Sequence, residues 1–202
     1  MPKIDYTRNV FINCPFDDDY LPIFRAIVFT VIDCGYIPRC ALELEDSTLV
    51  RIEKITRIIS ECKYGIHDIS RTESDKKTNL PRFNMPLELG IFLGARRFGD
   101  KEQTKKACLI LDRDRYRYQS FISDIAGQDI QSHDNSDLEA INVIRNWLRN
   151  VSARSTISGG KEIQRRYALF KSELPILCEK LKLGVDEMIF NDYTHLVYEW
   201  LR

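Results

Sequence analysis

The sequence lacks several features that would point directly to a function. Its 202 residues carry no net charge, because 30 Lys and Arg side chains balance 30 Asp and Glu side chains. Such a chain has no global positive field with which to hold a nucleic-acid backbone. We therefore expect no nucleic-acid partner, and the composition fits small-molecule or protein partners better.

The cysteines and apolar runs exclude further classes of site. The six cysteines are scattered, with neither a two-residue spacing nor a matching histidine pair, so no metal site is expected. Several lie inside apolar runs, which suits reduced, buried thiols in a cytoplasmic protein. The sequence holds no glycine-rich phosphate loop, nucleophile elbow or Walker-type motif. No apolar run reaches membrane-spanning length and the first residues do not resemble a signal peptide, so no membrane association is expected.

The sequence does contain a regular alternation of strand and helix patterns. Short apolar runs predict strands at residues 10–14, 36–42, 64–70, 107–111 and 128–131. Helical spacing of apolar residues predicts helices between them at residues 20–34, 47–59, 85–95 and 118–125. This alternation predicts an α/β domain, a three-layer open sheet of parallel, doubly wound strands. Pro38 would place its strand at an edge.

The last third of the chain reads as helical. We place the α/β domain at residues 1–135 and a C-terminal helical extension at residues 136–202. Within the extension, helices are expected at residues 138–148, 163–183 and 193–201. Pro175 is expected to kink or divide the middle one. The extension either packs on the sheet domain or forms an oligomer surface.

Polar residues lie at or just beyond the ends of three predicted strands. Asn13 and Asp17 mark the end of the first strand, Asp68 and Ser70 the end of the third, and Asp112 the end of the fourth. Ligands of open α/β sheets bind at the carboxyl ends of the strands. We therefore expect the ligand site at this edge of the sheet.

Glu88 is the most informative single residue. It lies between apolar residues at the start of the helix predicted at 85–95. Cleaving an N-glycosidic bond develops positive charge on the sugar ring, which a carboxylate can stabilise or attack. The alternative is a first-turn glutamate that only complements the helix dipole. Asp68 would hydrogen-bond a sugar hydroxyl or protonate the leaving base, unless it merely caps a loop.

Other residues have a functional and a structural interpretation. Arg39 and Arg82 could bind phosphate through bidentate contacts or form surface ion pairs. Ser70 could contact phosphate or ribose, or cap the following loop. Phe16, with Asn13 and Asp17, could form the floor near the sugar, although a phenylalanine is more often core.

The histidines are not expected to act as the base. His67 precedes Asp68 on a strand and should point to the opposite face, as a structural residue. His133 and His195 have no partner that the sequence reveals. Asp129, in a compact polar turn, could face the pocket across the sheet edge.

Three motifs together resemble the nucleoside 2-deoxyribosyltransferase-like and bacterial TIR-like domains. The first resembles their strand followed by a Pro-Phe turn, the second their aspartate at the end of the third strand, and the third their Glu-Leu-Gly entry to the helix with the catalytic glutamate. In this chain they are Phe11-Ile12-Asn13-Cys14-Pro15-Phe16, Asp68-Ile69-Ser70, and Glu88-Leu89-Gly90 followed by Leu93-Gly94-Ala95. The resemblance implies a flavodoxin-like sheet and catalytic roles for Glu88 and Asp68. Substrate-binding residues are then expected at Asn13, Phe16, Asp17, Ser70, Arg39, Arg82 and Asn84.

These expectations combine into one leading hypothesis and two alternatives. The leading hypothesis is an enzyme that cleaves or exchanges the N-glycosidic bond of a nucleotide, with NAD or a nucleoside monophosphate as substrate and no cofactor. By analogy it would be a homo-oligomer in a bacterial phage-defence or stress-response setting. The first alternative is a non-catalytic nucleotide-signal sensor, and the second is a protein-interaction module that has kept the fold and lost the site.

Overall fold

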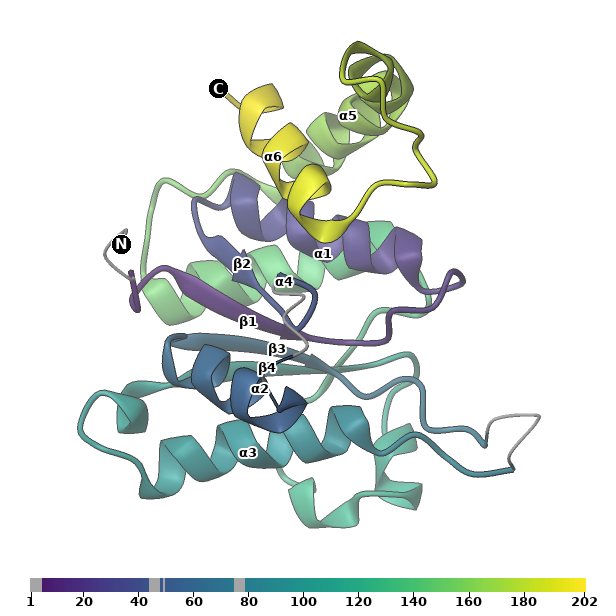
Figure 1. The fold of residues 1–202 in the computed structure, drawn as a ribbon. Coiled ribbons are helices and arrows are strands. Elements are labelled where there is room, and N and C mark those ends of the chain that lie inside the picture. Colours follow the sequence, from purple (N-terminus) through teal and green to yellow (C-terminus); the bar gives the residue numbers. More distant parts are fainter. Residues whose placement is uncertain (1–4, 44–47, 49, 75–78) are drawn as a thin grey trace.

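The molecule is built around a five-stranded parallel sheet (Figure 1). The computed structural model describes residues 5–43, 48, 50–74 and 79–202. The strands are β1 (Asn9–Asn13), β2 (Ile37–Arg39), β3 (Tyr64–Asp68), β4 (Ala107–Asp112) and β5 (Gln131–Ser132). Their spatial order is β2-β1-β3-β4-β5, and all neighbours are parallel. The predicted three-layer α/β fold is confirmed, and the strand with Pro38 lies at an edge, as expected.

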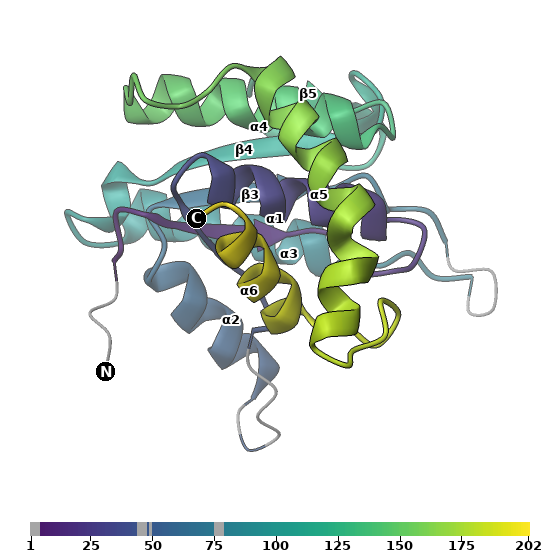
Figure 2. The same ribbon diagram turned by 90° about the horizontal axis from the view of Figure 1, so that it is seen from above.

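Helices cover both faces of the sheet (Figure 2). On one face lie α1 (Leu21–Asp33) and α4 (Asp137–Ser152), and on the other lie α2 (Arg51–Ser60) and α3 (Asn84–Phe98). The last helices, α5 (Gly160–Lys180) and α6 (Phe190–Trp200), form a further layer over α1. Short 3-10 helices follow α3 and β4, namely η1 (Gln103–Lys105), η2 (Arg117–Ser120) and η3 (Ser123–Ile125).

The strands are apolar because both of their faces are covered. In β1, Val10 and Ile12 pack into the cluster formed with α1 and α4, whereas Phe11 packs into the cluster with α2 and α3. This alternation follows the two-residue repeat of a strand. Every residue of β1 and β3 is buried, which explains why the sequence shows continuous apolar runs instead of an alternating pattern.

The C-terminal helices share a core with α1. The Phe29 ring of α1 lies 5.2 Å from Tyr167 and 5.4 Å from Phe170 of α5, measured between centroids. Trp200 of α6 completes this group, 6.2 Å from Phe29. Helix α1 is therefore enclosed between the sheet and the α5–α6 layer. The boundary at residue 136 stays a prediction.

Two expected helices differ in the structure. Residues 118–125 do not form one helix but lie in η2 and η3, because Ile122 between them leaves the helical region with φ −148° and ψ 58°. Pro175 does not divide α5, which runs unbroken from Gly160 to Lys180. The proline removes one hydrogen bond to the carbonyl of Lys171, and Lys171 is exposed, so water can replace that bond.

Element ends differ more modestly. The helix expected from residue 47 begins at Arg51, as α2, and residue 47 lies outside the described residues. Arg57 of α2 lies 3.3 Å from Glu61, one turn later. The last strand is shorter and later than expected, at Gln131–Ser132.

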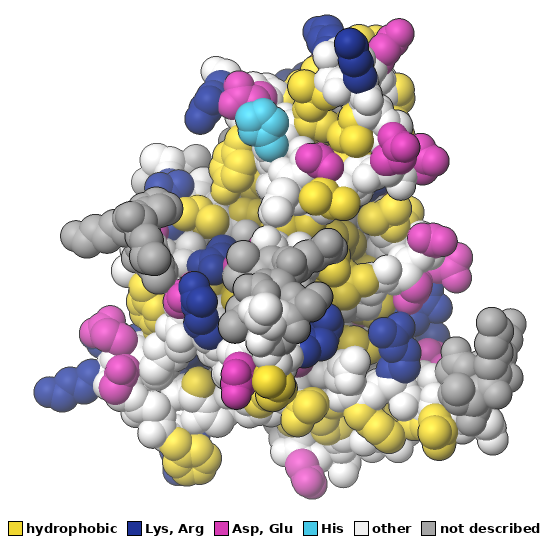
Figure 3. Space-filling model, in the orientation of Figure 1, with side chains coloured by type: hydrophobic (Ala, Val, Ile, Leu, Met, Phe, Trp, Pro, Cys, Tyr) yellow, Lys and Arg dark blue, Asp and Glu magenta, His cyan; other side chains and the backbone are white. Residues whose placement is uncertain are grey.

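The surface drawn in Figure 3 mixes both signs of charge. Lys and Arg side chains alternate with Asp and Glu on this face and do not gather by sign. Within the described ranges, none of the helices combines the length and the apolar character that a membrane span requires.

Candidate functional site

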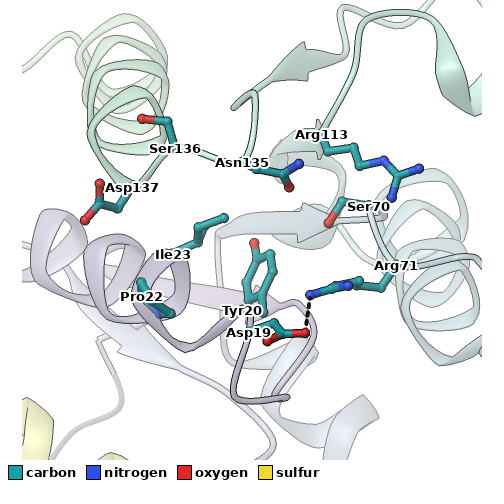
Figure 4. Close-up of a pocket in the computed structure, with 10 residues that line it drawn as sticks. All are labelled: Asp19, Tyr20, Pro22, Ile23, Ser70, Arg71, Arg113, Asn135, Ser136 and Asp137. Atoms are coloured by element: carbon teal, nitrogen blue, oxygen red, sulfur yellow. Dashed lines mark ion pairs between the residues drawn. The ribbon is translucent and has the colours of Figure 1, made fainter.

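A polar cavity of about 550 Å³ opens at the carboxyl edge of the sheet (Figure 4). It lies among the segments that follow β1, β3, β4 and β5, where parallel strands bring their carboxyl ends together. Its lining residues are Asp19, Tyr20, Pro22, Ile23, Ser70, Arg71, Arg113, Asn135, Ser136 and Asp137. This is the edge at which the sequence places the ligand site, and of the expected residues Ser70 lines the cavity itself.

Asp68 is fully buried behind this lining. Its Oδ2 accepts a 2.5 Å hydrogen bond from the Tyr20 hydroxyl and lies 2.9 Å from Nε2 of His133, and its Oδ1 accepts the Ser70 N–H at 2.8 Å. The Asn135 N–H donates to Nδ1 of His133 at 3.1 Å, so Nε2 carries the proton that faces Asp68. Burial raises the pKa of Asp68, but these hydrogen bonds outweigh burial and hold the pKa below its ordinary value. Asp68 therefore orients Tyr20 and His133 and has no surface of its own in the cavity.

His133 has a partner that sequence analysis missed. It lies far along the chain from Asp68, and only the folding of β3 beside β4 and β5 brings the two together. The two residues after it, Asp134 and Asn135, have φ angles of 50° and 52°. Asn and Asp are the non-glycine residues that tolerate this left-handed conformation best. The sequence signal that could have pointed to His133 is the Asp134-Asn135 pair directly after it, which is typical of a tight turn.

Two arginines line the cavity and were also missed. Arg71 lies 3.2 Å from Asp17 and 3.7 Å from Asp19, and Arg113 pairs with Glu73. All three carboxylates are at least 38% exposed, and ion pairs of this kind are weak in water. An anion that enters the cavity can therefore compete for both guanidinium groups. Each arginine directly follows a polar strand end, which is the signal that could have identified it.

Asp112 and Arg117 tie together the segments after β3 and β4. Arg117 donates to Asp112 at 2.9 Å and 2.6 Å, and also to the carbonyls of Ile69 and Ser70 at 3.0 Å and 2.8 Å. Burial raises the pKa of Asp112, and Arg117 opposes this shift. The side chain of Asp112, expected at the ligand edge, thus holds the walls of the cavity in place.

Glu88 lies in the second turn of α3. A glutamate that complements the helix dipole would lie in the first turn. Glu88 is 7% exposed, and its carboxyl group makes no hydrogen bond to any residue that the structure describes. Burial raises its pKa to about 7, against a smaller opposing effect of Arg51 at the start of α2. Glu88 does not line the cavity of Figure 4. The pKa of the Cys14 thiol, which directly follows β1, is raised mainly by burial and next by the charges of Asp68, Cys40 and Glu88. Both predicted catalytic carboxyl groups therefore lie within electrostatic reach of the end of β1.

Asn13 fixes α3 against the sheet. Its Nδ2 donates to the Met85 carbonyl at 2.9 Å and contacts Nδ1 of His67 at 3.1 Å. His67 is fully buried, and burial lowers its pKa to about 3, so the ring is neutral at physiological pH. His67 is structural, as expected, whereas the substrate-binding role expected of Asn13 stays a prediction. Asn13 positions the turn of α3 that leads to Glu88.

The remaining expected residues lie outside the cavity. Arg39 pairs with Glu43 at 2.6 Å and Glu61 at 3.0 Å, which is the ion-pair alternative. Phe16 is 37% exposed and packs edge-to-face on Phe24, with centroids 5.3 Å apart.

Arg82 and Asn84 flank the start of α3, and both are exposed. They reach neither Glu88 nor the cavity through any contact recorded among the described residues. Within the same ranges, no group of three or more His, Cys, Asp or Glu side chains is placed to hold a metal ion.

In comparisons with known proteins, no family model, no curated protein and no solved structure matches this chain. The resemblance to nucleoside 2-deoxyribosyltransferase-like and TIR-like domains therefore rests on the three sequence motifs alone.

Proposed function

We propose that this chain cleaves or exchanges the N-glycosidic bond of a nucleotide, NAD or a nucleoside monophosphate, at the carboxyl edge of its sheet. The observation that carries the proposal is Glu88, a buried carboxyl group in the motif Glu88-Leu89-Gly90, with a pKa raised to about 7 by burial. Carboxyl groups with strongly perturbed pKa values are more frequent at catalytic sites than elsewhere in proteins.

The environment of Glu88 suits the stabilisation of a sugar cation. Charges interact more strongly where water is excluded, so a carboxylate there stabilises developing positive charge more than an exposed one does. Asn13 supports this arrangement, since its hydrogen bond to the Met85 carbonyl holds the start of α3 at the end of β1. In this proposal Glu88 stabilises or attacks the anomeric carbon.

The cavity of Figure 4 suits the rest of a nucleotide. Arg71 and Arg113 can pair with phosphate oxygens, and the Ser70 hydroxyl points from the cavity wall toward Tyr20. Asp68 is then a positioning residue, because it is fully buried and holds the Tyr20 hydroxyl. This replaces the direct acid role that sequence analysis expects of Asp68.

The test is chromatography of the protein after incubation with NAD and, separately, with a panel of ribo- and deoxyribonucleotides. We expect the parent protein to release nicotinamide or a free base, and Glu88→Gln to lower the rate by ~10²–10³. Glu179→Gln, which changes an exposed glutamate of α5, is the matched control and should retain full activity. Equal turnover by Glu88→Gln, in a folded protein, would sink the proposed mechanism.

A second candidate is a non-catalytic nucleotide sensor. The observation that favours it is the absence of Glu88 from the residues that line the cavity. A nucleotide would then bind between Arg71 and Arg113 without reaching the carboxyl group. Calorimetric binding without product, weakened in Arg71→Ala but not in Glu88→Gln, would support the sensor over the enzyme.

We also propose a homo-oligomer in a reducing, cytoplasmic setting, with phage defence or stress response as the role implied by the resemblance. Phe83, which caps the start of α3, and Leu87, in the first turn of α3, are 66% and 56% exposed, and Leu87 directly precedes Glu88. All six cysteines are free thiols. Sedimentation velocity of the parent protein and of Leu87→Lys tests the assembly, which the charged variant should weaken.

A further inference from the structure

The outer edge of β4 is only partly covered. β4 pairs with β3 along Ala107–Leu111 on its inner side. On its outer side, β5 pairs only with Leu111 and Asp112. In the part of the chain that the structure describes, residues 107–110 of β4 therefore have no strand partner on this side.

The backbone groups of two β4 residues face this open edge. The Ala107 N–H donates to β3-side Lys63, and the Leu111 carbonyl accepts from Ile69 on the same side. Peptide groups alternate in direction along a strand, so Cys108 and Ile110 direct theirs outward. Cys108 is half-buried, and Ile110 is 3% exposed at the floor of this edge. Unpaired strand edges are templates for pairing with another chain.

A groove of about 510 Å³ runs along the open edge. The β4 residues Cys108 to Ile110 line it, with α4 on one side and the segment before β5 on the other. Side-chain amides dominate its polar lining, from Gln128, Gln131, Asn146 and Asn150. Amides both donate and accept hydrogen bonds, which suits the backbone of an extended peptide.

The groove carries negative charge. Asp129 and Glu139 are its charged lining residues, and neither Lys nor Arg is among the described residues that line it. Asp129 accepts a hydrogen bond from the neutral Gln131 at 2.6 Å, and Arg115 lines an adjoining cavity that Asp129 also lines. Arg96 of α3 acts on the Cys108 thiol but does not line the groove. The charge is thus complementary to a cationic ligand.

We propose that this groove binds an extended peptide segment of another protein that carries a lysine or arginine, added to β4 as a further parallel or antiparallel strand. The four open residues would span about 13 Å, the length of a short strand. A second copy of this chain is a poorer occupant, because edge-to-edge pairing would bring the Asp129 and Glu139 carboxylates of both copies together. The inference is independent of the function proposed for Glu88.

The probe is a set of acetylated, amidated pentapeptides of alternating Thr and Val, with one Lys placed at each position in turn. Titration into the ¹⁵N-labelled full chain should shift the amide signals of Cys108 and Ile110 and slow their hydrogen exchange by about tenfold or more. The same peptides with Glu in place of Lys should not bind.

Two variants separate backbone pairing from charge. N-methylation of the peptide at the residue that pairs with β4 should abolish binding, because it removes a ladder donor. The double variant Asp129→Asn with Glu139→Gln should weaken binding of the Lys peptides by about tenfold. Glu179→Gln is the matched charge control and should bind as the parent does.

Three results would overturn the inference. One is the absence of amide shifts with every Lys peptide at millimolar concentration. The second is binding that N-methylation at no position weakens, which would show a simple ionic contact. The third is protection of the same amides from hydrogen exchange without any peptide, if this protection increases with protein concentration. The occupant of the groove would then be a second copy of the chain.

Discussion

At the scale of single residues, three carboxyl groups near the same sheet edge have three different environments. Asp68 is buried with several hydrogen-bond donors, so its pKa falls. Asp112 is buried against Arg117, and burial still raises its pKa. Glu88 is buried without a hydrogen-bond donor among the described residues, and its pKa rises to about 7. The balance between burial, which raises the pKa, and the donors and charges that stabilise the carboxylate decides the direction of each shift.

The raised pKa of Glu88 should make stability depend on pH. Between its ordinary pKa of 4.5 and the folded value of about 7, the unfolded chain ionises while the folded protein does not. Stability is therefore lost as pH rises through this window, by about 3 kcal/mol at most. Glu88→Gln should remove this loss and be more stable than the parent at pH 8, but not at pH 4.5. Urea unfolding at both pH values measures the difference, with Glu179→Gln as control.

Tyr20→Phe should destabilise the protein by removing one donor from the buried carboxylate of Asp68. Hydrogen bonds to charged groups contribute about 1.5–3 kcal/mol, so a loss of ~2 kcal/mol is expected at neutral pH. Because the pKa of Asp68 is depressed, this stability is present above its unfolded pKa and is lost as pH falls through the folded pKa. The deficit should thus shrink at pH 3 in urea titrations.

Tyr198→Phe provides the comparison, since its hydroxyl only approaches the Tyr36 carbonyl at 3.5 Å. A loss of unfolding free energy in Tyr20→Phe that is small, or equal at both pH values, would contradict a hydrogen bond from Tyr20 to an ionised Asp68.

At the scale of elements, close packing sets how α3 lies on the sheet. A Cβ on Gly65 of β3 would lie 2.7 Å from Nε2 of His67 and 2.8 Å from a ring carbon of Phe92. The Phe92 ring of α3 also packs edge-on against His67, with centroids 4.9 Å apart. The glycine thus allows α3, and with it Glu88, to approach the strand.

Gly65→Ala should cost about 1–3 kcal/mol through overpacking. Adding Phe92→Leu should recover part of this loss, because it removes the ring that the new methyl group meets. Gly94→Ala is the matched control, since its Cβ would meet nothing within 4 Å, and it should stabilise α3 by ~0.5–1 kcal/mol. Chemical denaturation of the parent protein and of these three variants forms the test, and equal effects at Gly65 and Gly94 would refute the packing argument.

At the scale of the whole molecule, α1 joins the sheet to the C-terminal helices. Its Phe29 packs on Tyr167 and Phe170, while Ile27 and Val28 belong to the same buried cluster as the sheet residues. This shared core predicts that residues 1–135 and 136–202 unfold together.

Phe170→Ala should therefore lower the free energy of unfolding of the entire chain by about 3–5 kcal/mol in one transition. Circular dichroism and tryptophan fluorescence, which reports on Trp147 and Trp200, should give coincident curves. Two separated transitions would instead show that the helical extension is an independent unit. Leu169→Ala, at a largely exposed α5 position, is the control and should change little.

Local sequence patterns are enough to specify the layered α/β architecture. Continuous apolar runs at β1 and β3 require burial on both faces, and helical spacing between them requires crossover connections, so a parallel sheet follows. The sequence also indicated the edge where the cavity lies, because polar residues such as Ser70 directly follow strand ends. Local patterns suffice for these features because they depend on periodicity along a few residues.

The roles of individual side chains, in contrast, depend on contacts that form when the chain folds. His133 meets Asp68, and Arg39 meets Glu61, across distances in sequence that no local pattern encodes. Burial, which fixes the pKa of Glu88 and the role of Asp68, likewise depends on what the rest of the chain places around them. The open edge of β4 exists because β5 is too short to cover it. These properties depend on contacts and desolvation, and both exist only once the chain has folded.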